Sequence, residues 1–267
     1  MPPPDCQPIS VSKEKLEQLF SLYQGRQWVH PDPLEFLYLY SDDRDREIVG
    51  LIASALAYGR VAQILKSVSA VLEKMGPSPA NFLLSSTDAG LEKIFSGFKH
   101  RFTTAQDLID LLCGARTVCK RFGSIHGCFV AAHRDQHDTV YEALCFLAGE
   151  LGRANSRTSN SLLPLPARGS ACKRLHLFLR WMVRQDDVDP GGWDHVSPSK
   201  LIVPLDTHMH RICSQLGMTG RKQGDLKTAM EITRAFRKLA PEDPVKYDFV
   251  LTRLGIRNDC DPGELFE

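Results

Sequence analysis

The sequence lacks long apolar runs, close cysteine pairs and an excess of either charge. No stretch approaches the roughly 18 consecutive apolar residues that a transmembrane helix needs, so we expect no membrane span. The first residues, Met1–Asp5, have neither a basic region nor an apolar core, which argues against a signal peptide and predicts a cytoplasmic protein. Internal repeats and low-complexity tracts are also absent, which excludes solenoid and fibrous classes of protein.

The eight cysteines are spread along the chain and include no C-x-x-C pair. Zinc and iron–sulfur sites with four cysteine ligands need such close pairs. Most of the cysteines lie in apolar segments, as Cys145 does between Leu144 and Phe146. We therefore expect small buried side chains in a reducing compartment, with no metal and no cofactor.

Charge is almost balanced, because 33 Lys and Arg residues face 32 Asp and Glu residues for a net charge of +1. A protein that coats DNA regardless of sequence would be more basic, so any site for a polyanion must be local. Hydrophobic residues make up 43% of the 267 and charged residues 24%, values of an ordinary globular protein. The length suits one large domain or two small lobes.

Apolar residues recur with helical spacing along nearly the whole chain, which predicts an all-α fold. The second helix is expected to begin at a cap, Asp43 or Asp45, and to break at Gly59. The other expected helices cover residues 13–23, 61–76, 104–121, 138–151, 173–184, 206–217, 225–239 and 244–254.

The chain is interpreted as a single helical domain of two lobes over residues 1–267. Residues 152–163 are polar and predict a surface loop or hinge. Residues 163–217 hold the most informative features, a Pro- and Gly-containing hairpin followed by a buried helix. Residues 185–204 are rich in Asp, Pro and Gly and predict a long ordered loop or lid.

Lys173 opens a helix whose remaining residues are apolar almost all round. An amine near such low-dielectric surroundings loses hydration, which favours its neutral, nucleophilic form. The alternative is a surface lysine beside Arg174, with its stem along the protein and its charge in water.

Asp206 stands directly before an amphipathic helix, which is the position of an N-cap. It either serves only as a cap or points into a cleft and stabilises a developing cation. A metal site formed with His208 and His210 is disfavoured, since residues two apart on a helix face different directions.

Aromatic and acidic residues of the segment 185–195 form a third feature. Trp193 either stacks on a base or sugar or packs its Gly-rich loop onto the body of the protein. Asp189 lies in the same segment, and Trp181 lies in the apolar helix before it. We expect these three residues to line a substrate pocket or its lid.

The motif Asp206-Thr207-His208-x-x-Arg211 resembles a signature of base-excision DNA glycosylases of the endonuclease III superfamily. Leu165-Pro166-Ala167-Arg168-Gly169 is similar to the hairpin of their helix-hairpin-helix motif. Residues 47–60 resemble their early helix and the turn after it. Over about residues 30 to 260, the chain also resembles a bacterial family of uncharacterised domains.

The resemblance implies a two-lobed helical fold with Lys173 as the Schiff-base lysine and Asp206 as the essential aspartate. A flipped nucleotide of damaged or abasic DNA would enter between the lobes. The iron–sulfur cluster of one branch of the superfamily is not expected here, and neither is an obligatory protein partner. DNA contacts are expected from the hairpin and from nearby side chains, namely Gly169, Ser170, Arg174, Arg211, His208, Tyr58 and Arg60.

The function expected from these residues is an N-glycosylase of base-excision repair, with AP-lyase activity through a lysine Schiff base. One alternative is a non-catalytic helix-hairpin-helix module that binds nucleic acid. Another is an enzyme of the same fold that acts on RNA or nucleosides. The identity of the recognised lesion depends on the shape of the pocket.

Overall fold

The computed structural model describes residues 11–154 and 159–256. Over these ranges the chain is mostly helical, as its apolar periodicity predicts, with one small antiparallel sheet. None of the described helices combines the length and the apolar composition that crossing a bilayer requires. The elements are α1 (Lys13–Tyr23), η1 (Arg26–Trp28), η2 (Pro33–Leu39), α2 (Asp43–Ala55), α3 (Val61–Met75), α4 (Pro79–Ser85), α5 (Asp88–Phe95), β1 (Lys99–His100), β2 (Thr103–Thr104), α6 (Ala105–Phe122), α7 (Ile125–Ala132), α8 (Tyr141–Gly152), η3 (Pro166–Arg168), α9 (Lys173–Val183), η4 (Pro198–Lys200), α10 (Thr207–Gln215), α11 (Leu226–Leu239) and α12 (Asp248–Ile256).

The cap of α2 differs from the sequence prediction. Asp42, not Asp43 or Asp45, is the N-cap, and its side chain accepts hydrogen bonds from the amides of Arg44 and Asp45. Asp45 instead accepts from the Ala80 amide at 2.8 Å and so joins α2 to the start of α4. Three acids in four residues offer the same local pattern, and tertiary contacts give each a different partner.

The structure also contains short elements that the periodicity did not predict. Helices α4, α5 and α7 have seven or eight residues each, too few for an apolar repeat to stand out. A hydroxyl caps each of them, from Ser78, Thr87 and Ser124 respectively. Strands β1 and β2 pair over two residues each, which is too short for an alternation of polar and apolar residues to be detected in the sequence.

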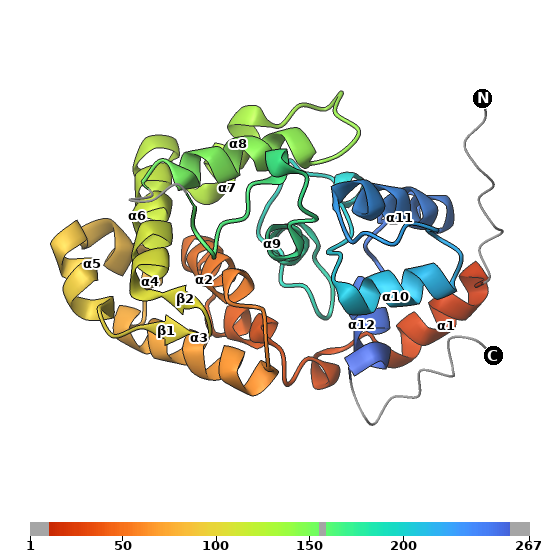
Figure 1. The fold of residues 1–267 in the computed structure, drawn as a ribbon, viewed down its shortest axis with the longest axis horizontal. Helices are drawn as coiled ribbons and strands as arrows, with labels where there is room; N and C mark the ends of the chain where they lie inside the picture. Colours follow the sequence, from red (N-terminus) through yellow and green to blue (C-terminus); the bar gives the residue numbers. More distant parts are fainter. Residues whose placement is uncertain (1–10, 155–158, 257–267) are drawn as a thin grey trace.

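Figure 1 shows α9 at the centre of the molecule, between two groups of helices. Helices α2 to α8 lie on one side, and α1, α10, α11 and α12 lie on the other. Helix α9 is buried from Leu175 to Val183, as its apolar sequence predicts, and packs on α2. Gly50 permits the close approach, because a Cβ atom there would lie 3.3 Å from the Phe178 ring.

Helix α1 joins the C-terminal group although it begins the described chain (Figure 1). Glu17 accepts hydrogen bonds from Lys246 Nζ and from the Tyr247 hydroxyl, each at 2.7 Å. The first and the last described helices therefore belong to the same group, and the segment from α2 to α8 forms the other.

The predicted loop or hinge at residues 152–163 is described in part, since residues 155–158 lie outside the described residues. The Asn160 side-chain amide donates to the Asp107 carbonyl at 2.8 Å. Leu162 and Leu163 are buried. This end of the segment is thus packed against α6.

His176 on α9 is fully buried, and neither ring nitrogen has a hydrogen-bond partner among the described residues. Burial lowers its pKa to about 4, from about 6.5 in an unfolded chain. The unfolded state therefore binds a proton more readily, so this group contributes stability above about pH 6.5 that is lost as the pH falls toward 4.

We expect the free energy of unfolding to fall by about 2 kcal/mol between about pH 7.5 and pH 5 through His176 alone. Urea titrations at the two pH values measure it in the native chain and in His176→Leu, which has no titrating group there. A variant with the same pH dependence as the native chain would show that other groups cause it.

Candidate active site

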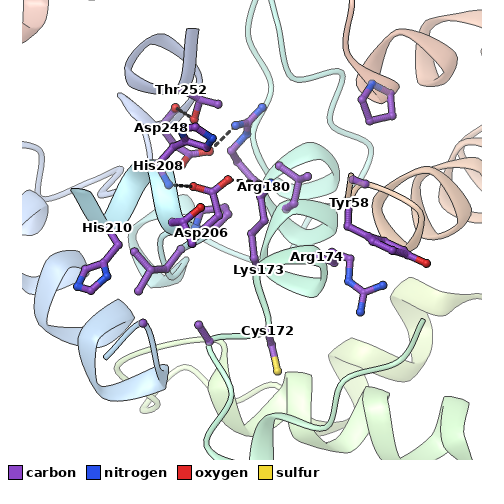
Figure 2. Close-up of a pocket in the computed structure, with 18 of the residues that line it drawn as sticks. Tyr58, Cys172, Lys173, Arg174, Arg180, Asp206, His208, His210, Asp248 and Thr252 are labelled. Atoms are coloured by element: carbon purple, nitrogen blue, oxygen red, sulfur yellow. Dashed lines mark hydrogen bonds and ion pairs between the residues drawn. The ribbon is translucent and has the colours of Figure 1, made fainter. Parts of the chain in front are cut away.

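A groove of about 1340 Å³ opens between the two groups of helices, beside the first turns of α9. One wall comes from the turn after α2 and from α3, and the other from the start of α10 and from α12 (Figure 2). Its principal polar side chains are Tyr58, Ser170, Lys173, Arg174, Arg180, Asp206, His208, His210, Lys222, Asp248 and Thr252.

Lys173 and Asp206 meet in this groove. Lys173 Nζ lies 3.1 Å from Asp206 Oδ2, with about a third and a quarter of the two side chains exposed. Lys173 is the first residue of α9 and Asp206 is the N-cap of α10, so two helix N-termini bring them together. Figure 2 shows both side chains reaching into the same space.

Asp206 caps α10 and also points into the groove, so capping is not its only contact. Its Oδ1 accepts hydrogen bonds from the amides of His208 and Met209, at 3.0 and 2.9 Å, which caps α10. Its Oδ2 is the atom that contacts Lys173. Burial disfavours the charged carboxylate, but the Lys173 ammonium and the Met209 amide outweigh it and hold the pKa of Asp206 below its usual range.

Behind this pair lies a buried charge network. Arg180 on α9 donates from Nε and Nη2 to Asp189 and from Nη1 to Asp248. Arg184, one turn further along, pairs with Asp189 and with Asp243. Each buried charge is compensated, so the network fixes the loop after α9 and the start of α12 against α9.

On the opposite wall, Arg174 is used in holding the fold together. Its Nη1 donates to the Ala55 carbonyl at 2.6 Å and its Nη2 to the Ser161 carbonyl at 2.7 Å. Its guanidinium carbon lies 5.1 Å from the centroid of the Tyr58 ring. The hydroxyl of Tyr58 donates to the His100 carbonyl, so its ring presents a fixed face beside the groove.

The other residues predicted to contact DNA divide into two sets. Ser170 and His208 line the groove. Gly169, Arg60 and Arg211 are exposed and lie outside its lining. DNA contacts from all of these residues stay predictions.

The predicted hairpin exists as a turn but does not lead straight into α9. Residues Pro166–Arg168 form η3, and Gly169 follows in the left-handed conformation with φ +79°. The Gly169 amide donates to the Pro166 carbonyl, and Ser170 bridges to Asp225 before α9 begins. The Gly169 amide is therefore not a free donor for a phosphate.

The prediction that Trp193, Asp189 and Trp181 line the substrate pocket is wrong, because none of them lines the groove. Trp193 is buried, and its Nε1 donates to Glu47 Oε1 at 2.9 Å, which pins its loop to α2. Asp189 and Trp181 are completely buried. These residues are structural, since the loop packs as part of the core and does not cover the groove.

No group of three or more His, Cys, Asp or Glu side chains placed to hold a metal ion occurs in residues 11–154 and 159–256. His210 Nε2 instead hydrogen-bonds to the Arg221 carbonyl at 2.8 Å. The cysteines within these ranges are free thiols. Cys6 and Cys260 lie outside the described residues.

The sequence interpretation gave no role to Asp248 and Thr252, which line the groove one helical turn apart. An acid just before the apolar run Phe249–Leu251 was the available signal. It does not specify which surface the acid faces, because that depends on where α12 packs.

The fold and the groove together define a helical protein with a lysine–aspartate pair between two groups of helices. The chain belongs to a family described as proteins of unknown function (DUF2400), whose model matches residues 32–257. The match includes nearly the whole lining of the groove. No curated protein and no solved structure matches the chain.

Proposed function

We propose that the chain is a DNA base-excision enzyme, an N-glycosylase that also cleaves the strand through a lysine Schiff base. The observation that supports this most strongly is the 3.1 Å contact between Lys173 Nζ and Asp206 Oδ2 in an open groove. An amine and a carboxylate in contact are the groups that such a reaction needs.

In the proposed reaction, Asp206 takes a proton from Lys173, and the neutral amine attacks C1′ of a flipped nucleotide. The bond from C1′ to the base breaks, its electron pair leaves with the base, and Asp206 returns the proton to the base. As this proton passes to the departing base, the restored Asp206 carboxylate stabilises the positive charge that develops on the sugar. A second proton then passes from the lysine nitrogen to the ring oxygen, the bond between C1′ and that oxygen breaks, and the protonated Schiff base forms. Loss of a C2′ proton then expels the 3′ phosphate and cleaves the strand.

The size of the groove favours a polymeric substrate. Pockets for small molecules usually enclose about 300–1,000 Å³. The groove, at about 1340 Å³, exceeds this range and is open along the boundary between the helix groups. It thus has room for a nucleotide that enters while it is attached to its strand.

An exposed aromatic beside the groove supports a nucleic-acid substrate. Phe102, between β1 and β2, is 66% exposed, and its ring centroid lies 4.9 Å from that of Tyr58. Its neighbour Arg101 lies against Gly59 in the groove wall. Exposed rings with adjacent cations are the elements that stack bases and contact phosphates in single-stranded nucleic acid. A DNA substrate fits the cytoplasmic location that the sequence predicts.

The test is reductive trapping by borohydride on oligonucleotides that carry an abasic site or one of a panel of damaged bases. We expect the native chain to form a covalent adduct. Asp206→Asn should lower the rate of trapping at least about 100-fold, because the proton acceptor is lost. Asparagine caps helices as well as aspartate does, so the melting temperature should change little.

Asp225→Asn is the matched control, since Asp225 caps α11 in the same way but lies outside the groove lining. It should trap at the native rate. Equal trapping by Asp206→Asn and the native chain would contradict the role of Asp206. No adduct on any probe, together with undiminished DNA binding by the variant, would favour a non-catalytic binding module.

A further inference from the structure

One carboxylate in the groove has an unpaired oxygen. Asp248 lines the groove at the start of α12, with only 4% of its side chain exposed. Its Oδ2 accepts from Arg180 Nη1, whereas its Oδ1 has no hydrogen-bond partner among the described residues. A buried acceptor without a donor is costly and uncommon in folded proteins, so it calls for an explanation.

The neighbouring groups do not supply the missing donor. The three hydrogen bonds that Arg180 donates to carboxylates go to Asp189 Oδ1 and to Asp248 Oδ2, and none goes to Asp248 Oδ1. The Thr252 hydroxyl donates to the Asp248 carbonyl at 2.7 Å, so its oxygen has only acceptor capacity left. This part of the wall therefore offers two acceptors one helical turn apart (Figure 2).

The two acceptors lie beside the proposed reaction centre. Asp248 occupies the same wall as Asp206, which faces Lys173 (Figure 2). Burial raises the pKa of the Asp248 carboxyl against the opposing charge of Arg180, and the charges of Asp206 and Lys173 act on it as well. A base whose sugar lies at Lys173 would thus present one of its edges toward Asp248 and Thr252.

We propose that Asp248, with Thr252, determines specificity by accepting hydrogen bonds from a base with two adjacent N–H donors. Among the common bases this is the guanine-type edge, with a ring N–H next to an amino group. The edges of adenine and cytosine place a ring acceptor beside the amino group, and that acceptor would face an acceptor on the protein. This inference deepens the proposed function and rests on it.

We expect the isosteric variant Asp248→Asn to change which base the groove prefers. Arg180 Nη1 needs an acceptor, so the asparagine oxygen stays toward Arg180 and its amide N–H groups turn toward the groove. The groove then offers a donor where the native chain has an acceptor. Arg180 keeps both contacts to Asp189, which supports folding of the variant.

The test measures dissociation constants of guanosine, inosine, 1-methylguanosine and adenosine by ligand-observed NMR. We expect the native chain to bind guanosine at least about tenfold tighter than 1-methylguanosine or adenosine, with inosine between them. Asp248→Asn should lose this preference and bind adenosine more tightly than the native chain does. Asp243→Asn, which removes a partner of Arg184 outside the groove, should keep the native order.

Equal binding of guanosine and 1-methylguanosine, or no binding of any nucleoside, would overturn the inference. Preference for adenosine would overturn it too, since it would mean that Oδ1 carries a proton and donates. Trapping by the native chain on an abasic site involves no base, so it reports on the proposed function separately. Guanosine preference without trapping would retain the subsite and refute the proposed lysine Schiff base.

Discussion

Lys173→Gln should abolish covalent trapping on abasic DNA, a loss of at least about 1,000-fold, because glutamine has no nucleophilic amine. The glutamine amide still donates a hydrogen bond toward Asp206, so the carboxylate keeps a partner. Circular dichroism and the melting temperature should therefore stay close to those of the native chain. The measurement is the amount of borohydride-stabilised adduct against time on a denaturing gel.

Lys222→Gln is the matched control, because Lys222 lines the same groove and is exposed. It should weaken DNA binding modestly at low salt and retain trapping, as loss of one phosphate contact does. Native-level adduct from Lys173→Gln would show that another amine reacts. Unlabelled DNA, RNA and free ribonucleosides can be compared as competitors of adduct formation. If RNA or ribonucleosides compete more strongly than DNA, an enzyme that acts on RNA or nucleosides would be favoured.

Asp189→Asn should lower the free energy of unfolding by about 3–5 kcal/mol, the usual loss when one member of a buried ion cluster is removed. Asp189 is completely buried and receives hydrogen bonds from both Arg180 and Arg184. The neutral amide leaves two buried guanidinium groups with too little negative charge. Urea unfolding followed by tryptophan fluorescence measures the change.

Asp194→Asn provides the comparison, since Asp194 lies in the same loop but its side chain is 75% exposed. Its removal should cost less than about 1 kcal/mol, as for exposed charges in general. A loss below about 1 kcal/mol in Asp189→Asn would show that Trp193 and the backbone hold the loop without the charge network.

Local sequence patterns predicted the helices that are long enough to repeat. Helix α1 and the start of α9 fall where the spacing of apolar residues placed them, and Asp206 caps α10 as its position predicted. Helices α4, α5 and α7 were missed because one or two turns contain too few apolar positions to define a face.

The candidate site was predictable only in part. The resemblance to glycosylases selected Lys173 and Asp206. Local sequence alone was equally compatible with a surface lysine and with an aspartate that only caps a helix. Trp193 was predicted in a lid because a Gly-rich loop with an aromatic is compatible with both stacking and packing. The carboxylate of Glu47, which is distant in sequence, accepts a hydrogen bond from the Trp193 indole, so the ring packs against the body of the protein.

Local sequence patterns were enough to predict that this chain folds as helices, where most of the longer helices begin, and which ionisable residues stand at their N-termini. Those features depend on groups within a few residues of one another. The contact between Lys173 and Asp206, the burial of Asp189, and the position of Asp248 at the groove with one oxygen unpaired could be seen only in the folded protein. These outcomes depend on how α9, α10 and α12 pack, and packing is set by the shape of whole apolar surfaces.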